Sequence, residues 1–134
     1  EVLDEILAQY RVVQHGVADE LEMGLRFLDK NVEISLNTER IGLLGLGPAG
    51  QVAIIDVSLH PDERLLQTGL KHFDWVLRSA EELKKRYAPQ INLLQRPKLF
   101  LVSPGFPEAV KLRLRGLEAV EVILVEYRVF LAGE

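Results

Sequence analysis

Two apolar runs joined by a very short segment constrain the fold of this chain more than any other feature. Residues 40–46 and 51–59 are rich in leucine, isoleucine and valine, and a glycine- and proline-containing segment at 47–50 separates them. Apolar runs of this length bounded by turn residues predict strands. The short connection predicts an antiparallel hairpin, because a parallel pair needs a crossover of a dozen or more residues.

The rest of the chain supplies helices and strands around this hairpin. Apolar residues at helical spacing predict a helix over 2–28, and alternation predicts a half-buried strand over 32–36. The later elements are a long helix entered at His60-Pro61-Asp62 and extended to Tyr87, a strand at 98–103, a short helix at 107–117 and a strand at 120–130. A helix between the last two strands predicts a parallel crossover. The expected fold is α/β, a mixed sheet of about five strands flanked by helices on both faces.

The hairpin contains a string, at residues 45–50, that matches the dinucleotide-binding pattern G-x-G-x-x-G. That pattern binds a pyrophosphate only where its third glycine opens a helix. Gly50 is followed instead by apolar and β-branched residues. The acid that binds the ribose is expected about 20 residues further on, and Asp56 comes too early for that role. We therefore predict a glycine-rich hairpin turn rather than a nucleotide site.

The composition limits which binding partners and which cellular compartment the chain can be expected to have. The 134 residues are expected to form one domain, and a formal net charge of −4 would not steer nucleic acid towards it. The absence of cysteine excludes disulfides and Cys-ligated zinc, and fits a cytoplasmic protein. The apolar runs are far shorter than a membrane span, which predicts no membrane partner. Because the first residue is Glu1, the domain at 1–134 is compatible with a piece of a longer chain.

The hairpin and the helix after it resemble a known family. Residues 40–58 resemble, in length and apolar pattern, the catalytic hairpin of the PD-(D/E)XK nucleases, particularly the single-strand and mismatch endonuclease branch. The segment 67–76, which contains Gln67 and Trp75, is similar to the helix that follows in that family, and 98–104 resembles its next core strand. The resemblance covers roughly residues 20–130. It implies a restriction-endonuclease-like (tRNA endonuclease-like) fold.

The departures from the family pattern fall where the chemistry should be. In the family, the hairpin Asp and the Glu of Glu-x-Lys hold a divalent metal, which prefers such oxygen ligands, and the Lys helps to activate water. Matching the hairpins places Gly42 at the Asp position, Asp56 at the Glu position and Ser58 at the Lys position. One carboxylate is left, so Asp56 is a metal ligand only if the site is active. The former catalytic positions implied by the resemblance are Gly42, Asp56, Ser58 and, on the next helix, Gln67.

Other residues leave alternatives open around this site. Strand alternation places Arg40 on the face of Gly42, where it would suit an ion pair with Asp56. Because a charged group in an apolar strand needs a partner or water, Asp56 fits either a structural ion pair or a remnant ligand site. A second carboxylate is available from glutamates on the first helix or beside the hairpin, namely Glu20, Glu22 and Glu39.

The helix after the hairpin carries a polar face that fits two uses. Gln67, Lys71 and Asp74 recur at helical spacing, and they form either a solvated face or, for Gln67 and Lys71, the lining of the former groove. Glu20, Arg40 and Lys71 are therefore the binding candidates. The three histidines do not share a metal-binding spacing.

These observations predict a catalytically degenerate nuclease-like domain that acts as a nucleic-acid- or protein-binding module and needs no cofactor. One alternative is an active endonuclease that uses Mg²⁺ or Mn²⁺ with relocated carboxylates. The other is a pure protein–protein adaptor. Nucleic acid is expected to bind weakly because of the net charge of −4, and a homo-oligomer is compatible with the sequence.

Overall fold

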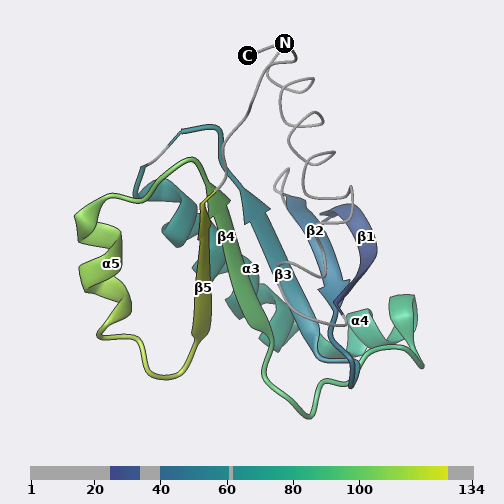
Figure 1. Cartoon of the computed structure of the whole chain (residues 1–134). Helices are drawn as coiled ribbons and strands as arrows, with labels where there is room; N and C mark the ends of the chain where they lie inside the picture. The colour runs from purple at the N-terminus through teal and green to yellow at the C-terminus, as the bar shows by residue number, and fades with distance from the viewer. Residues whose placement is uncertain (1–24, 34–39, 61, 127–134) are drawn as a thin grey trace, which may run out of the picture.

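A mixed β-sheet forms the centre of the molecule. The computed structural model describes residues 25–33, 40–60 and 62–126, and its five strands lie side by side in chain order (Figure 1). They are β1 (Arg26–Glu33), β2 (Arg40–Leu46), β3 (Val52–Val57), β4 (Lys98–Ser103) and β5 (Glu121–Glu126). The pairs β1–β2 and β2–β3 are antiparallel, whereas β3–β4 and β4–β5 are parallel. The predicted α/β class, the hairpin and the parallel crossover are confirmed.

The hairpin between β2 and β3 closes through a tight turn. The amide of Gly47 donates to the Gln51 carbonyl at 2.8 Å, and the amide of Gly50 donates to the Gly47 carbonyl at 3.0 Å. Gly50 has a φ of 81°, and a Cβ atom there would lie 2.8 Å from the carbonyl oxygen of Gln90. Glycine is required because this backbone conformation and this close approach both disfavour a side chain. The chain then enters β3 rather than a helix, which confirms the turn and removes the nucleotide interpretation.

The described helices are α3 (Arg64–Arg78), α4 (Ala80–Tyr87) and α5 (Glu108–Leu114). The single long helix predicted to reach Tyr87 is wrong in its continuity, because the backbone of Ser79 leaves the helical region with φ −111° and ψ 30°. The helix also starts later than predicted. The Asp62 carboxylate accepts the amides of Arg64 and Leu65 at 2.8 and 3.3 Å, so Asp62 precedes the helix and satisfies two of its first donors. None of these three helices has the length and apolar composition of a membrane span.

The first described strand corrects another prediction. The expected helix at 2–28 is wrong for its last residues, because Arg26 and Phe27 belong to β1 and pair with Leu46 and Gly45 of β2. Cross-strand pairing against a buried strand outweighs the helical spacing of the apolar side chains. The strand predicted at 32–36 therefore begins earlier. Residues 1–24, 34–39 and 127–134 lie outside the described residues.

Apolar side chains are buried on both faces of the sheet. On one face, strand residues such as Leu44, Ile54 and Leu99 pack with the buried apolar side chains of α3, α4 and α5. On the other face, Leu43 and Ile55 belong to a second buried cluster, which also contains Phe100 and Val102. The buried apolar side chains of the three described helices all belong to the first cluster. Within the described residues, helices therefore cover one of the two faces on which they were expected.

Helix α3 lies close against β4 because of a glycine. A Cβ atom at Gly69 would lie 2.8 Å from Cδ2 of Leu101 and 2.9 Å from Cδ2 of Leu99. Both leucines are fully buried, so they have little room to move aside. The close approach sets the height of α3 above the sheet, and it places His72, less than one turn further on, beside Asp56 of β3.

A polar contact ties β1 to α4. The Tyr87 hydroxyl donates a hydrogen bond to Oδ2 of Asp29 at 2.7 Å. Partial burial, together with the hydrogen bond and the negative charge of Asp29, raises the pKa of Tyr87 to about 12. The neutral phenol is thus the form that the fold favours.

Candidate functional site

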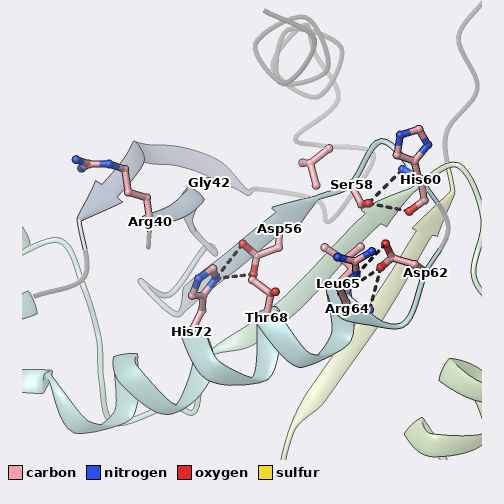
Figure 2. Close-up of a pocket in the computed structure, with 11 residues that line it drawn as sticks. Arg40, Gly42, Asp56, Ser58, His60, Asp62, Arg64, Leu65, Thr68 and His72 are labelled. Carbon is pink, nitrogen blue, oxygen red and sulfur yellow. Dashed lines mark hydrogen bonds and ion pairs between the residues drawn. The ribbon is translucent and has the colours of Figure 1, made fainter. Parts of the chain in front are cut away.

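A polar pocket lies where β2 begins, where β3 ends and where α3 begins. It has a volume of about 450 Å³. Its lining comes from Arg40 and Gly42 on β2, from the segment 56–58, and from side chains of α3 that include Thr68 and His72. Figure 2 shows this arrangement, with α3 running beneath the ends of the two strands. Four sequence-predicted site positions therefore converge in one place, namely Arg40, Gly42, Asp56 and Ser58.

A buried histidine–carboxylate pair forms the floor of the pocket. Nδ1 of His72 lies 3.0 Å from Oδ1 and 2.9 Å from Oδ2 of Asp56 (Figure 2). His72 is 2% exposed and Asp56 is 5% exposed. A carboxylate buried this far needs a donor, and His72 supplies it from a different element. The predicted structural pairing of Asp56 therefore exists, but its partner is His72.

Arg40 has a different place from the one expected. It lines the pocket from the first residue of β2 and is exposed. In Figure 2 its guanidinium points away from Asp56 and His72. Arg40 is therefore a rim residue and not the group that neutralises Asp56.

The side-chain oxygens of Ser58 and Asp62 are engaged in local structure. The Ser58 hydroxyl donates to the His60 carbonyl at 2.7 Å and accepts the His60 amide at 3.2 Å. One carboxylate oxygen of Asp62 accepts the amides at the start of α3, and the other lies 3.8 Å from Nε of Arg64. These contacts hold the loop between β3 and α3 in position beside the pocket.

The hairpin register supports the placement of Gly42, Asp56 and Ser58 in one site. Leu43 pairs with Ile55 across β2 and β3, so continuing the register by one residue sets Gly42 opposite Asp56. Asp56, at the end of β3, and Ser58, directly after it, both line the pocket.

Two sequence-predicted residues lie elsewhere. Gln67 and Lys71 are exposed and do not line the pocket, and Asp74 on the same helix face is exposed as well. Asp74 instead pairs with Arg78 at 3.0 Å on the surface of α3. The remaining candidates, Glu20, Glu22 and Glu39, lie outside the described residues.

Sequence reasoning missed His72, which the structure brings into the site. Gln67, Lys71 and Asp74 lie on the exposed face of α3, which is the solvated-face alternative of the sequence analysis. The helix face that meets the pocket is formed by Leu65, Thr68 and His72, which follow the spacing i, i+3 and i+7. No sequence pattern marks His72 as the partner of Asp56.

The donor set can be tested against the divalent metal that the family resemblance implies. Among residues 25–33, 40–60 and 62–126, no group of three or more His, Asp or Glu side chains is arranged to hold a metal ion. Both oxygens of Asp56 face an imidazole nitrogen, and Gly42 offers no ligand. Mg²⁺ needs several oxygen ligands in near-octahedral geometry. The described residues of the pocket do not fit this metal.

Several solved structures have an architecture similar to that of this chain. The structure of a repair endonuclease from Pyrococcus abyssi matches with a TM-score of 0.61 and 16% sequence identity, over 88% of this chain and 45% of that chain. A complex of EndoMS with double-stranded DNA matches with a TM-score of 0.60 and 15% identity, over 88% of this chain and 43% of that one. EndoMS in its apo form matches with a TM-score of 0.54 and 17% identity, over 92% and 47%. The domain has the restriction-endonuclease-like fold.

The chain spans less than half the length of each of these structures. No protein-family model and no curated protein matches the sequence. The likeness is therefore one of fold, and the chemistry of the site depends on its own residues.

Proposed function

We propose that this domain is a nuclease-like module that binds nucleic acid at the Asp56 pocket and does not cleave it. The observation that carries the proposal is the buried pair between Asp56 and His72, whose atoms lie 2.9–3.0 Å apart. The family resemblance assigns the position of Asp56 to a metal-binding Glu. Among the described residues no cluster of acidic or histidine side chains that could hold a metal surrounds this carboxylate, whereas a divalent metal needs several oxygen ligands.

The two other former catalytic positions support the same conclusion. Gly42 has no side chain to share a cation with Asp56. The Ser58 hydroxyl is neutral and is held by the backbone of His60, so it cannot supply the positive charge of a lysine. The three positions together lack the charges that metal-dependent hydrolysis requires.

Nucleic acid is the proposed ligand for two reasons. A structure with which this chain shares its fold is a complex of EndoMS with double-stranded DNA. Two arginines, Arg40 and Arg64, line the pocket and are exposed, so they can reach phosphate oxygens. The net charge of −4 opposes a high affinity, and binding should therefore be weak and sensitive to salt.

A binding experiment tests the proposal. Fluorescence anisotropy with labelled single-stranded DNA, double-stranded DNA and RNA should show binding at low salt that declines as salt is added. Arg40→Gln and Arg64→Gln should each weaken it and reduce the slope of log affinity against log salt by about 0.7–0.9. Arg113→Gln on α5, an exposed arginine that does not line the pocket, is the matched control and should bind like the wild type.

Two results would overturn the proposal in different directions. Cleavage of any of these substrates that needs Mg²⁺ or Mn²⁺ and disappears in Asp56→Ala would establish an active endonuclease with relocated carboxylates. Absence of binding to all three nucleic acids even at low salt, where phosphate contacts are strongest, would favour the protein–protein adaptor.

A further inference from the structure

The two edge strands of the sheet differ in how well they suit the addition of a further strand. β1 forms one edge of the sheet and β5 forms the other. β1 has a bulge between Phe27 and Asp29, and its exposed side chains include the charged Arg26, Asp29 and Lys30. Bulges and exposed charges protect an edge strand against pairing. The β1 edge is therefore poorly suited to a further strand.

The β5 edge consists of a regular, apolar strand. β5 reads Glu-Val-Ile-Leu-Val-Glu over Glu121–Glu126, and its register with β4 is unbroken. In the part of the chain that the structure describes, β5 pairs with β4 alone, and its backbone makes no hydrogen bond outside that pairing. The outer side of β5 therefore presents backbone donors and acceptors to which another strand can pair (Figure 1).

The side chains of β5 are apolar on both faces of the sheet. Val122 and Leu124 pack against the first buried cluster, whereas Ile123 and Val125 pack against the second. All four are half-buried, in contrast to the buried residues of the neighbouring strand β4. A strand added at this edge would remove more of this apolar surface from water on both faces, which favours its addition.

The two glutamates at the ends of β5 show that this strand is compatible with a second copy of itself. Glu121 and Glu126 are an odd number of residues apart, so their side chains lie on opposite faces of the sheet. In an antiparallel strand pair related by a two-fold axis, each residue lies opposite a residue of the same face. Glu121 therefore cannot lie opposite the partner's Glu126, and the strands can pair through their apolar residues without this repulsion.

We propose that β5 pairs with β5 of a second copy of this chain, antiparallel and about a two-fold axis at Leu124. Val125 then lies opposite the partner's Ile123, and Glu126 lies opposite the partner's Val122. The pairing joins the two five-stranded sheets into one continuous sheet. The interface is separate from nucleic-acid binding, because the Asp56 pocket has no lining residue from β5.

The charges around β5 favour this register. The last turn of α5 carries Lys111 and Arg113, and the exposed Arg115 follows it. This basic end of α5 leads into the start of β5, and the two lie at the same end of the molecule (Figure 1). Antiparallel pairing brings the partner's Glu126 to that end of the strand. The acidic end of each β5 therefore meets the basic end of α5 in the other copy, twice in the dimer.

Sedimentation equilibrium of the full wild-type chain over a concentration series measures the association. One strand pair forms a smaller interface than a standard protein complex, so we expect a Kd on the order of micromolar or weaker. Glu126→Lys places like charges together at the end of the strand pair and should weaken the dimer about fivefold. The matched control is Glu63→Lys, because Glu63 is exposed and makes no capping hydrogen bond. It should leave the Kd within about twofold.

Disulfide cross-linking tests the register, because the chain contains no cysteine. The two-fold axis sets the two Leu124 residues opposite each other, at a Cα separation of about 4.5–5.5 Å that a disulfide can bridge. Under mild oxidation, Leu124→Cys should form an intermolecular disulfide roughly tenfold faster than Leu94→Cys. Leu94 is 97% exposed in the loop before β4, so its cross-linking measures random collisions. Circular dichroism under reducing conditions verifies that both variants fold.

The possible outcomes separate this interface from other modes of association. A wild-type chain that stays monomeric far above micromolar concentration overturns the inference. A dimer in which Leu124→Cys cross-links no faster than Leu94→Cys overturns it as well, because the copies then meet through another surface. If Leu124→Cys does not fold, the effect of Glu126→Lys compared with Glu63→Lys decides. These measurements use no nucleic acid, so the inference and the proposed function can fail separately.

Discussion

Asp56 and His72 lie 16 residues apart in the sequence, and they form a buried hydrogen-bonded pair between the third strand and the helix that covers it. Each residue supplies the hydrogen-bond partner that the other needs in the interior, because either one alone would leave an unpaired polar group there. The pair also fixes the rotation of α3 above β3. Structure and candidate site therefore depend on the same contact.

The first prediction concerns the stability that depends on this pair. His72→Leu leaves the Asp56 carboxylate buried without its donor and should lower the free energy of unfolding by about 3–5 kcal/mol. The double variant Asp56→Leu/His72→Leu should be less destabilised than the two single costs combined, because it buries no unpaired charge. Urea unfolding followed by circular dichroism measures both values.

The exposed Gln67 on the same helix serves as the control. Gln67→Leu should change stability by no more than about 0.5 kcal/mol. A cost for His72→Leu as small as that of Gln67→Leu would show that the pair does not hold α3 on the sheet.

The parts of this fold that could be predicted are those with a local pattern. The segment at 47–50 is too short for anything other than a hairpin, and a helix between two apolar strands requires a parallel crossover. The start of β1 could not be predicted, because Arg26 and Phe27 become strand only by pairing with β2. The break at Ser79 was equally hidden, since the apolar residues on its two sides keep helical spacing.

The candidate site was predictable for the hairpin and not for the helix. Gly42 and Asp56 lie on two adjacent strands and Ser58 directly follows the second strand, so the hairpin alone brings the three residues together. The rotation of α3 depends on how deeply it packs, and Gly69 sets that depth against Leu99 and Leu101. A lone histidine has no sequence pattern that reveals a partner 16 residues away.

The second prediction tests the close packing of α3 on β4. Gly69→Ala gains about 1 kcal/mol of helix propensity, but its Cβ would lie within 2.9 Å of buried leucine methyl groups. Overpacking of this kind costs about 1–3 kcal/mol, so the variant should be destabilised by roughly 1 kcal/mol. Thermal unfolding measures the change.

Gly116→Ala provides the comparison, because the nearest atom to its Cβ is the Arg113 carbonyl oxygen at 3.7 Å. That variant should be neutral within about 0.5 kcal/mol. Stabilisation of Gly69→Ala by the full propensity gain would contradict the close approach of α3 to Leu99 and Leu101.

The third prediction concerns alkaline pH. The pKa of Tyr87 is raised from 10.0 to about 12 in the folded protein, so the folded state holds the phenol proton more tightly than the unfolded state. The resulting stabilisation is complete below pH 10 and is lost as the pH rises towards 12. Its size is modest because Tyr87 is partly exposed.

Near-ultraviolet absorbance titration of the wild type and Tyr87→Phe should assign the most alkaline tyrosine transition to Tyr87. Asp29→Asn removes the negative charge beside the hydroxyl and should lower that transition. A Tyr87 that titrates together with the other tyrosines would be inconsistent with the hydrogen bond to Asp29.

The last prediction concerns restoration of a metal site. The hairpin register sets Gly42 next to Asp56, and Ser58 lines the same pocket. The triple variant Gly42→Asp/Asp56→Glu/Ser58→Lys should therefore gain affinity for Mn²⁺, because two carboxylates on adjacent strands can share one cation. Metal that binds only the folded state stabilises it by about 2.7 kcal/mol at a concentration 100 times the Kd. The melting temperature of the variant should thus rise with Mn²⁺, whereas that of the wild type should not.

His72 gives this experiment its internal comparison, since its Nδ1 hydrogen competes with the metal for the carboxylate at position 56. Adding His72→Leu to the triple variant removes that donor and should increase the Mn²⁺-dependent stabilisation further. Ser58→Lys alone supplies no second carboxylate and should show no response to metal. A triple variant that folds, as judged by circular dichroism, but gains no stabilisation with or without His72 would mean that Gly42 and Asp56 do not hold the former ligand positions, and the argument for a degenerate nuclease site would lose its main support.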